Sequence, residues 1–385
     1  MRRFAALVAV LSLVVVACGG PLLANPPAPH PVITPAPPSP VRPADPQPVV
    51  LPRDDGAHDR LTEWWYDTGH LVDEAGGRWG FELVVFRAER GGFPVTWASH
   101  LALTDETGGA FHYAQRAEIG PQVNAAAGAA GFDLAIRGMD LSDPKTFSRV
   151  PWTMAGSGGT DHLAAAALPA EAQGDGAGVG FGLSLDLAAT KPAALHGGDG
   201  YVDFGLAGGS YYYSRTSMTA TGTISVGART LKVTGSAWFD HQWGDFISVG
   251  GGGWDWFALN LADGTDVTLS LVRAADGSYP LVYGTLVPAS GATRRLGPGD
   301  FTVAVTGHWT SPLTGATYPA GWKVSLPSED LVVNLVPTVA QQELDTRATT
   351  GVVYWEGSQH VTATRNGVAL GGEAYVELTG YAAGR

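Results

Sequence analysis

The amino-acid sequence predicts an all-β protein whose strands form barrels or sandwiches in two packed units. Apolar and polar residues alternate along many short runs, and these runs end in Gly, Asp or Pro, which is the pattern of strands joined by turns. The sequence contains no long apolar stripe with helical spacing. The ~330 residues that follow the first fifty exceed what one small core accommodates, so we expect two units.

Alternating residues locate several strands directly. The clearest runs are Trp79 to Val85, Leu231 to Val233 and Val267 to Leu271, in which every second residue is apolar. Turn pairs predict hairpins, and they are Asp263-Gly264, Asp276-Gly277 and Asn366-Gly367. The small apolar segment Leu163 to Leu168 is expected to form either one helical turn before Pro169 or a loop.

The first seventeen residues have the pattern of a signal peptide. A short basic start, Arg2-Arg3, precedes the apolar stretch Phe4 to Val16, which is too short to span a membrane. The stretch ends in Val15-Val16-Ala17-Cys18, which resembles the lipobox of bacterial lipoproteins, and Cys18 is the single cysteine of the chain. We therefore expect an exported lipoprotein, anchored to the cell envelope through a lipid on Cys18. The alternative is a secretory signal that contains a cysteine by chance.

Residues 18–52 are expected to form a tether. Residues 21–52 contain 13 of the chain's 26 prolines, a density that neither a helix nor a sheet ladder tolerates. Such a segment stays extended and acts as a spacer between a membrane surface and a folded domain.

Charge and cysteine content exclude several classes of partner. The formal net charge is −13 at pH 7, which argues against nucleic acid and against electrostatic docking on anionic lipid. The remaining expected membrane contact is the lipid anchor. With one cysteine, the fold relies on its cores and not on disulfide bonds.

Six ordered motifs carry a resemblance to a known family. They are Glu63-Trp64-Trp65-Tyr66, Tyr211-Tyr212-Tyr213-Ser214-Arg215, Trp238-Phe239-Asp240-His241-Gln242-Trp243-Gly244, Gly253-Trp254-Asp255-Trp256-Phe257, Tyr354-Trp355-Glu356-Gly357 and Gly372-Glu373-Ala374-Tyr375-Val376-Glu377. Across residues 58–383 the chain resembles the AttH-type, lipocalin-like family, which includes bacterial carotenoid 1,2-hydratases. This resemblance implies two lipocalin-like (calycin-type) antiparallel β-barrels in tandem, packed against each other. We place them at residues 53–235 and 236–385, and small barrels of this kind hold one apolar ligand.

Two motifs near the middle of the chain combine carboxylates with aromatic residues. Asp240 and His241 are candidates for an acid/base pair, and Asp255 lies between two tryptophans. A carboxyl group buried among aromatic rings is costly unless it is hydrogen-bonded or protonated, and a protonated carboxyl group is a proton donor. The alternative is structural: Asp240 and His241 satisfy backbone groups, and Asp255 faces water while Trp254 and Trp256 face the core.

Other polar residues beside aromatics have the same two interpretations. Glu63, Glu356 and Glu377 either brace the barrels through hydrogen bonds or, for Glu356, act as a partner in proton transfer. Tyr211 and Tyr213 should share one face of a strand while Tyr212 takes the other, and Arg215 should pair with a carboxylate. The aromatic residues that we expect to line a ligand site are Trp65, Tyr213, Trp243, Trp254 and Trp256.

The sequence lacks the signatures of several common enzymes. It has no G-x-S-x-G nucleophile motif, no H-E-x-x-H, and no close pair of histidines at metal spacing. No glycine-rich loop has the strand-then-helix context of a nucleotide site. We therefore expect no cofactor and no metal.

The resemblance implies acid-catalysed addition of water to an isoprenoid or polyene double bond. Asp255 would donate the proton, tryptophan faces would stabilise the cation, and His241 with Asp240 would position water. Because this chain is expected to be exported, two other functions stay open. One is a non-catalytic carrier of lipid, pigment or polyketide, and the other is a cyclase or isomerase of a polyene.

Overall fold

The computed structural model describes residues 44–126, 130–138, 149–246 and 251–382. A compact unit begins at Pro48 and continues to the end of the chain. The expected signal peptide, Cys18 and most of the expected tether lie outside the described residues. Among the described residues, no helix has the length and apolar character that crossing a membrane requires.

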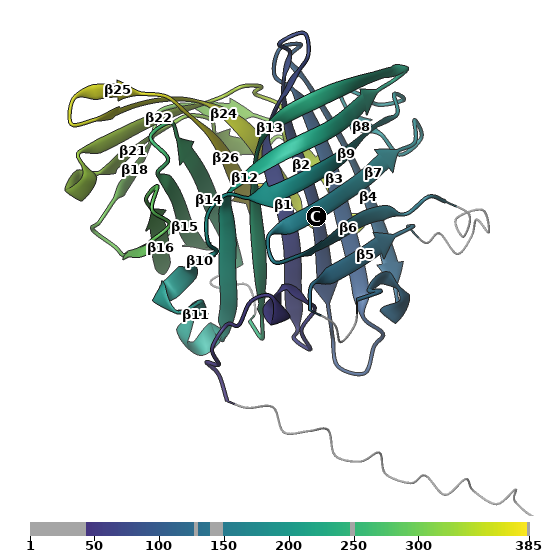
Figure 1. Cartoon of the computed structure of the whole chain (residues 1–385), viewed down its shortest axis with the longest axis horizontal. Helices are drawn as coiled ribbons and strands as arrows, with labels where there is room; N and C mark the ends of the chain where they lie inside the picture. Colours follow the sequence, from purple (N-terminus) through teal and green to yellow (C-terminus); the bar gives the residue numbers. More distant parts are fainter. Residues whose placement is uncertain (1–43, 127–129, 139–148, 247–250, 383–385) are drawn as a thin grey trace, which may run out of the picture. The chain divides into compact units, whose positions relative to one another are not determined.

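The all-β prediction is confirmed, because strands dominate the described residues and form two large curled antiparallel sheets (Figure 1). The first sheet has the order β5-β6-β7-β9-β12-β13-β1-β2-β3-β4-β8, with β10 and β11 also paired to β12. Its strands are β1 Thr62–Asp73, β2 Arg78–Ala88, β3 Thr96–Asp105, β4 Ala110–Ile119, β5 Phe132–Ile136, β6 Trp152–Ser157, β7 Thr160–Ala167, β8 Gln173–Gly174, β9 Phe181–Ala189, β10 Ala194–Leu195, β11 Tyr201–Asp203, β12 Gly209–Val226 and β13 Arg229–Gly244.

The second sheet has the order β17-β16-β15-β14-β26-β24-β22-β21-β18, with β23 and β25 also paired to β24. Its strands are β14 Gly251–Leu261, β15 Asp266–Ala274, β16 Leu281–Val287, β17 Arg294–Leu296, β18 Thr302–Val305, β21 Trp322–Leu326, β22 Leu331–Pro337, β23 Glu343–Asp345, β24 Val353–Arg365, β25 Val368–Leu370 and β26 Gly372–Thr379. The remaining elements are the strand pair β19 His308–Thr310 and β20 Thr317–Pro319, and the short 3-10 turns η1 Arg53–Asp55, η2 Pro121–Val123, η4 His196–Gly198, η5 Gly205–Ala207 and η6 Pro327–Glu329.

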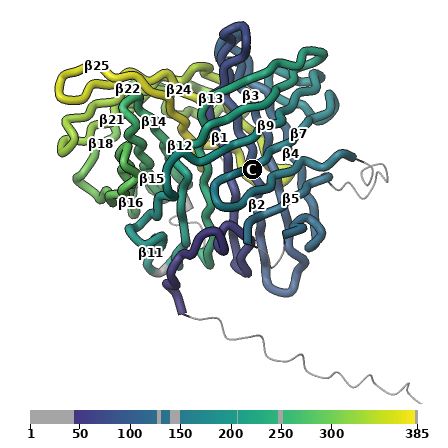
Figure 2. The backbone as a smooth tube through the Cα atoms, viewed as in Figure 1, coloured from purple at the N-terminus to yellow at the C-terminus, as the bar shows by residue number. Residues whose placement is uncertain are grey.

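Each sheet curls around its own apolar core. The first core is built from the inward residues of β1 to β13 and includes Trp65, Trp97 and Trp152. The second core includes Phe257, Trp322 and Trp355. Between the sheets, β26 packs against β1 and β24 packs against β2, an arrangement that can be followed along the tube in Figure 2. We call this zone, where the outer face of the first sheet meets the second, the seam.

The strands and hairpins expected from alternation are present. Trp79, Phe81, Leu83 and Val85 all lie in β2 and are buried in the first core. The three turn pairs each connect antiparallel neighbours: β14 to β15, β15 to β16, and β24 to β25. At the last of these, φ is 51° for Asn366 and 73° for Gly367. An Asn-Gly pair tolerates two positive φ values in succession, which is why this dipeptide forms the tight turn.

Two local expectations are corrected by the structure. Leu163 to Ala167 forms neither a helical turn nor a loop but the end of β7, in which Leu163, Ala165 and Ala167 are buried and their neighbours are exposed. Alanine has a high intrinsic preference for helices. Here the pairing of β7 with β9 overrides that preference. The end of the expected tether is also folded, because Val49 and Leu51 pack on the first core.

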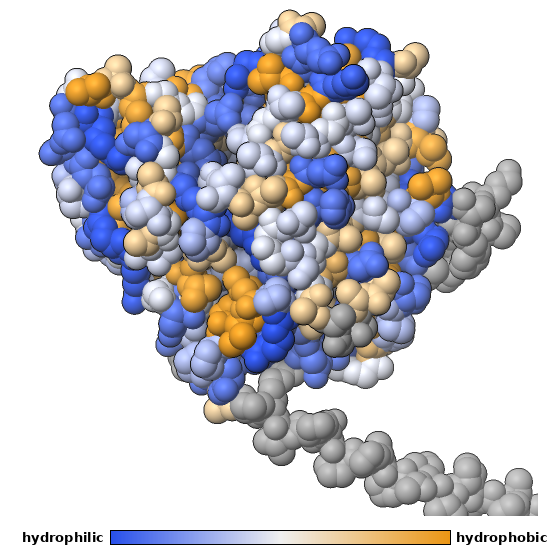
Figure 3. Space-filling model, in the orientation of Figure 1, coloured by the Kyte–Doolittle hydropathy of each residue, from blue (hydrophilic) through white to orange (hydrophobic). Residues whose placement is uncertain are grey.

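The chain passes from the first sheet to the second between Gly244 and Gly251, because β13 pairs with both β1 and β12 up to its last residue, Gly244. This lies later in the chain than the boundary after residue 235 that we expected from sequence. Figure 3 shows that the face in this view carries hydrophilic and hydrophobic residues interspersed. The large exposed apolar side chains of the described residues come from separate parts of the chain, some from loops, such as Phe93, Val150 and Leu313, and some from strands, such as Val336 and Val368.

Candidate functional site

A row of polar side chains crosses the outer face of the first sheet at the seam. Neighbouring strands place Ser214, Asp240, Tyr66, Val84 and His100 side by side in register, on β12, β13, β1, β2 and β3. Because side chains alternate between the two faces of a strand, this row faces the second sheet while the residues beside it in sequence face the first core. The register therefore assembles polar groups from four strands, with Val84 of β2 between them, on one surface.

Aromatic residues from both sheets surround this row. The cluster comprises Tyr66, Val84, Trp238, Trp256, Ala258 and Tyr375, with Trp64, Phe86 and Trp254 packed against it. The rings of Trp238 and Trp256 meet edge to face, with centroids 6.1 Å apart, and so do those of Tyr66 and Trp256 at 5.5 Å. Faces of such rings stabilise a cation placed beside them.

Glu356 projects into the seam from β24 and is buried. Tyr66 donates a hydrogen bond to Glu356 Oε1 at 2.6 Å, and Oε2 has no partner among the described residues. Burial first, and then the nearby carboxyl groups of Glu82 and Glu377, raise the pKa of Glu356 well above its ordinary value. Glu356 is therefore a weaker acid than an exposed glutamate, and one of its oxygens is available to a ligand.

Glu82 is a second buried acid, and it comes from β2. Its Oε1 lies 2.8 Å from the Tyr354 hydroxyl, and that hydroxyl lies 2.7 Å from His100 Nδ1. Glu82 Oε2, like Glu356 Oε2, has no partner among the described residues. Burial raises the pKa of Glu82 to about 8, against a smaller lowering effect of the Tyr354 hydrogen bond. Burial also lowers the pKa of His100 to about 3, so this imidazole is neutral.

Asp240 is the carboxyl group of the seam with the most donors. Tyr212 donates at 2.5 Å and the Trp238 indole at 2.7 Å, and Ser214 donates to the same carboxylate. Burial raises the pKa of Asp240 to about 6, and the three hydrogen bonds oppose that rise. Asp240 is therefore mainly ionised at neutral pH, unlike Glu82. Glu377, the cross-strand partner of Glu356, has a pKa raised to about 7 by burial.

His241 lies on the other side of β13, inside the first sheet. Its Nε2 is 2.9 Å from Glu63 Oε1, which is also 2.7 Å from His58 Nδ1. The His241 ring stacks on Trp65 with centroids 4.7 Å apart, and the His58 ring lies flat on Trp243 at 4.0 Å. Burial lowers the pKa of His241, while the pKa of His58 is raised by hydrogen bonds to Asp54 and Glu63 that outweigh its burial.

Among the described residues, His58, Glu63 and His241 could hold a metal ion, because one ligand atom from each lies within 4.8 Å of the others. The two histidines are far apart in sequence, so sequence spacing gave no indication of this group. Here Glu63 Oε1 lies within hydrogen-bond distance of both imidazoles, while His241 Nδ1 is buried without a partner among the described residues.

The structure separates Asp255 from the seam. Asp255 is buried on the face of β14 opposite to Trp254 and Trp256, toward the second core. Arg273 Nη1 forms an ion pair with it at 2.9 Å, and Tyr381 donates to it at 3.0 Å. Asp255 therefore faces neither water nor the aromatic cluster, and the expected grouping of Asp240, His241 and Asp255 does not form. Strand alternation is the reason, because it also places Asp240 and His241 on opposite faces of β13.

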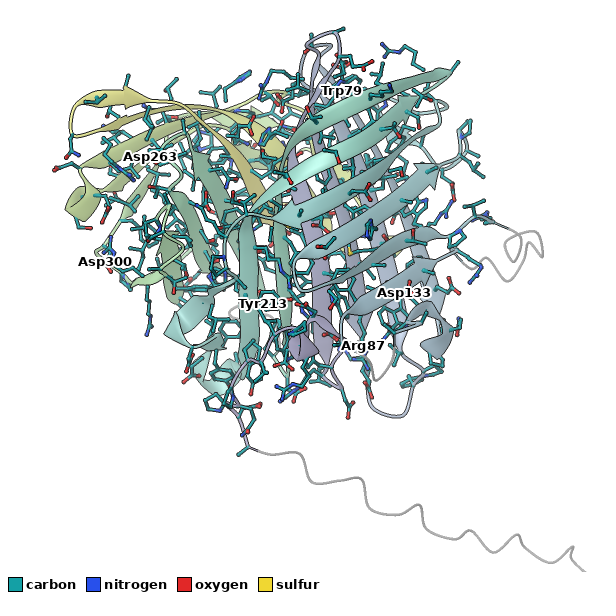
Figure 4. The ribbon with its side chains drawn as sticks, viewed as in Figure 1. Trp79, Arg87, Asp133, Tyr213, Asp263 and Asp300 are labelled. Atoms are coloured by element: carbon teal, nitrogen blue, oxygen red, sulfur yellow. The ribbon has the colours of Figure 1, made fainter. Side chains whose placement is uncertain are left out.

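The tyrosine motif follows the expected alternation. Tyr211 and Tyr213 face the first core, and Tyr212 faces the seam. Arg215 pairs with Asp55 at 2.6 Å, which confirms that it pairs with a carboxylate, and Tyr213 donates to the same Asp55 carboxylate. Figure 4 labels Tyr213 on β12 among the surrounding side chains. Tyr213, Trp65 and Trp243 thus belong to the first core and not to the seam.

Of the predicted site residues, the seam brings together Asp240, Glu356, Trp254 and Trp256. Sequence reasoning missed Tyr66, Glu82, His100 and Tyr354 as members of this site. A signal for Glu82 existed, because it is the one charged residue within the run Trp79 to Val85. A groove of about 340 Å³ lies at the seam, lined by residues that include Lys191, Ser236, Asn260, Asp266 and Glu373. Glu82, Asp240 and Glu356 are not among its lining residues.

Fold and site together define a protein of two curled antiparallel sheets with buried carboxyl groups clustered where the sheets meet. The chain belongs to the AttH-like family, whose model matches residues 42–381. The crystal structure of an AttH protein from Nitrosomonas europaea is 31% identical, covers 87% of this chain and 98% of its own, and superposes with a TM-score of 0.72.

Two further similarities concern fungal proteins. A dehydratase named asqC from Emericella nidulans is 28% identical over 172 residues, which is 41% of this chain and 46% of the relative. The match thus spans less than half the length of that curated relative. Kievitone hydratase from Nectria haematococca shares the fold, with 14% identity, a TM-score of 0.63, and coverage of 87% of this chain and 94% of its own.

Proposed function

We propose that this protein is a lyase that adds water to, or removes water from, a carbon–carbon double bond of an apolar small molecule at the seam. The proposal depends on one observation, which is that carboxyl groups buried together at the seam titrate in different pH ranges. Burial raises the pKa of Glu82 to about 8 and that of Glu356 well above its ordinary value, whereas the pKa of Asp240, which accepts three hydrogen bonds, is about 6. Acid–base catalysis needs a proton donor and a proton acceptor that are both in working form at the same pH.

The chemistry follows from these states. In hydration, a neutral carboxyl group transfers its proton to one alkene carbon, and the other carbon becomes a carbocation. The rings of Trp238, Trp256 and Tyr66 offer π-faces or edges around that position and exclude bulk water. A water oxygen then bonds to the cation, and its surplus proton passes to the Asp240 carboxylate. Dehydration is the same sequence in reverse, and after either direction one proton must be returned to the donor.

Two buried oxygens at the seam are available to a ligand or water. Glu82 Oε2 and Glu356 Oε2 are both buried and lack a partner among the described residues, whereas their Oε1 atoms are held by tyrosines. A buried oxygen without a partner costs about 1–3 kcal/mol, and a ligand or water at that position would recover this. The relatives named as a dehydratase and a hydratase support the same reaction class.

The experiment measures incorporation of labelled oxygen. The protein is incubated in ¹⁸O-water with acyclic isoprenoids such as squalene and lycopene, and products are analysed by mass spectrometry. We expect addition of one labelled water, with Glu356→Gln and Glu82→Gln each reducing the rate by about a hundredfold or more. Exposed Glu74→Gln is the control. Addition of water by the wild type that neither variant reduces would contradict the assignment of the seam.

A non-catalytic carrier is the second candidate. It is favoured by Asp255, because the acid expected from sequence is fully engaged by Arg273 and Tyr381. A carrier would retain the isoprenoid through gel filtration without incorporating labelled oxygen.

We further propose, from the sequence pattern around Cys18, that lipid on this residue holds the protein at the cell envelope. Cys18→Ser should then move the protein from the membrane fraction to the soluble fraction.

A further inference from the structure

Tyr354, His100 and Thr349 extend the contacts of Glu82 to the surface of the protein. Tyr354 Oη lies 2.8 Å from Glu82 Oε1 and 2.7 Å from His100 Nδ1, and His100 Nε2 lies 3.1 Å from Thr349 Oγ1. Glu82, Tyr354 and His100 are buried, while Thr349 is partly exposed. A continuous line of hydrogen-bonding groups thus runs from the seam to solvent.

The numbers of donors and acceptors, counted from the outer end of this line, determine the direction of each hydrogen bond. The Gln115 amide donates to the Asp345 carbonyl at 2.7 Å, so its Oε1 faces Thr349, and the two oxygens are 2.8 Å apart. An amide oxygen only accepts, so the single hydroxyl proton of Thr349 goes to Gln115. Thr349 must then accept from His100, which places the imidazole proton on Nε2.

The directions of the inner hydrogen bonds, from His100 to Glu82, follow in the same way. A neutral imidazole with its proton on Nε2 has a bare Nδ1, which accepts from the Tyr354 hydroxyl. Tyr354 has then used its only proton, so its oxygen accepts from Glu82. Glu82 must therefore carry a proton on Oε1. If Glu82 were ionised, each hydrogen bond in this line would run in the opposite direction. Thr349 would then have to donate to both His100 and Gln115, although it has only one hydroxyl hydrogen. The neutral acid satisfies every contact along this line, and only the Thr346 carbonyl, 3.2 Å from Thr349 Oγ1, competes with Gln115 for the Thr349 proton.

We propose that Glu82 is the acid of the seam that exchanges protons with solvent, and that Tyr354, His100 and Thr349 form the relay that reprotonates it. This assignment rests on the proposed function and deepens it, because it distinguishes Glu82 from Glu356. Within the described part of the chain, no comparable line of hydrogen bonds connects the hydroxyl of Tyr66, the partner of Glu356, to the surface.

The relay balances one proton at a time. When Glu82 exchanges its proton with solvent, each proton first moves one place outward: from Glu82 to Tyr354, from Tyr354 to His100 Nδ1, from His100 Nε2 to Thr349, and from Thr349 to water. Tyr354 then donates to the carboxylate, His100 Nδ1–H to Tyr354, and Thr349 to His100 Nε2. Reprotonation shifts each proton one place inward: from Tyr354 to Glu82, from His100 Nδ1 to Tyr354, and from Thr349 to His100 Nε2. Thr349 then takes one proton from water. Each of the three relay groups is neutral before and after, which suits a histidine whose burial disfavours its charged form.

The proposal can be tested without a substrate. A buried neutral carboxyl group has an infrared carbonyl band separate from that of carboxylates, and the band shifts when its proton is replaced by deuterium. Infrared difference spectra of the wild type minus Glu82→Gln and of the wild type minus Glu356→Gln assign one band to each glutamate. The spectra are recorded at about pH 6, below the pKa of Glu82. After dilution into D₂O, we expect the Glu82 band to shift faster than the Glu356 band.

Variants at the outer end of the relay provide the decisive comparison. Thr349→Val removes the hydroxyl at a partly exposed position, and we expect deuterium exchange at Glu82 to slow by about tenfold or more, as an added barrier of about 1.4 kcal/mol would produce. Exchange at Glu356 should not change. Thr350→Val is the matched control, because the Thr350 hydroxyl bonds to Thr346 and not to the relay.

The outcomes separate this proposal from the proposed function. An ionised Glu82 at about pH 6, exchange at Glu82 no faster than at Glu356, or equal exchange in Thr349→Val and Thr350→Val would each overturn the relay. Failure to incorporate labelled water from ¹⁸O-water, with slowed exchange in Thr349→Val, would instead leave the relay intact and contradict the reaction.

Discussion

Tyr66 of β1 donates a hydrogen bond of 2.6 Å to Glu356 of β24, which lies 290 residues further along the chain. This bond joins the two sheets beside the aromatic cluster, to which both sheets contribute residues. It also determines which Glu356 oxygen remains without a partner. Stability and the candidate chemistry therefore depend on the same contact, and removing it should affect both.

Tyr66→Phe tests this contact, because it removes one hydroxyl and preserves the ring. Glu356 would lose its donor, and an unsatisfied buried acceptor costs about 1–3 kcal/mol in the free energy of unfolding. Urea denaturation measures the difference. Tyr279→Phe is the control, since the Tyr279 hydroxyl lies 3.4 Å from Asp255 and its side chain is exposed. Equal losses in the two variants would argue against a special role for the Tyr66 bond.

Glu82 should make the protein less stable as pH rises through the neutral range. The pKa of Glu82 is about 8 when folded, against an ordinary value of 4.5. Between these values the unfolded chain has lost the proton and the folded protein keeps it, so the free energy of unfolding falls as pH increases, by at most about 1.4 kcal/mol per pH unit. Above the folded pKa this dependence ends.

Glu82→Gln removes that titration. We therefore expect wild type and variant to differ least at about pH 4.5 and the variant to gain relative stability up to about pH 8. Urea unfolding across this range measures the difference, and Glu74→Gln, at an exposed position, should show none of it. A constant difference between wild type and Glu82→Gln would mean that Glu82 is ionised in the folded protein.

Asp255 and Arg273 should behave as a structural ion pair. Because Arg273 also donates to the carbonyls of Gly252 and Thr379, it keeps partners when Asp255 changes. We expect Asp255→Asn to lower the free energy of unfolding by about 1–3 kcal/mol, and a double-mutant cycle with Arg273→Met to show coupling of similar size. Addition of labelled water should remain within severalfold of wild type. A loss of about a hundredfold or more would restore Asp255 as the acid.

Glu63 should stabilise the protein above its folded pKa. Burial opposes ionisation of Glu63, yet hydrogen bonds from His241 and His58 lower its pKa overall. A lowered acid pKa contributes stability that is present above the ordinary value of 4.5 and is lost as pH falls through the folded value. We expect Glu63→Gln to cost about 2–4 kcal/mol at neutral pH and less in acid, measured by urea unfolding. A cost independent of pH would show that the charge of Glu63 contributes nothing.

The last residues of the expected tether should contribute to stability. Val49 and Leu51 pack on the first core, while Val50 is exposed. A chain that begins at Arg53 should therefore lose about 1–3 kcal/mol relative to one that begins at Pro48. Leu51→Ala should reproduce part of the loss and Val50→Ala should not. Thermal and urea unfolding of the four proteins measure this, and equal stability would show that the tether extends to residue 52.

The sequence alone determined the class of fold and much of its local structure. Strands such as β2 and turns such as Asn366-Gly367 follow from period-two alternation and from backbone preferences, which act between neighbouring residues. Alternation also predicted that Tyr212 would face away from Tyr211 and Tyr213, and it does. The same rule separates Asp240 from His241, although adjacency in a motif had grouped them.

The tertiary structure alone decided which residues form the site. Tyr66, Glu82 and His100 lie in one sheet and Tyr354 and Glu356 in the other, and no periodicity encodes which faces of two distant sheets will meet. Burial of a carboxyl group, and therefore its pKa, depends on that meeting. Asp255 was prominent in the sequence but is neutralised by Arg273, a partner 18 residues away on the neighbouring strand β15. Sequence shows which side chains exist, and only packing decides which of them lose water and which find a counter-charge.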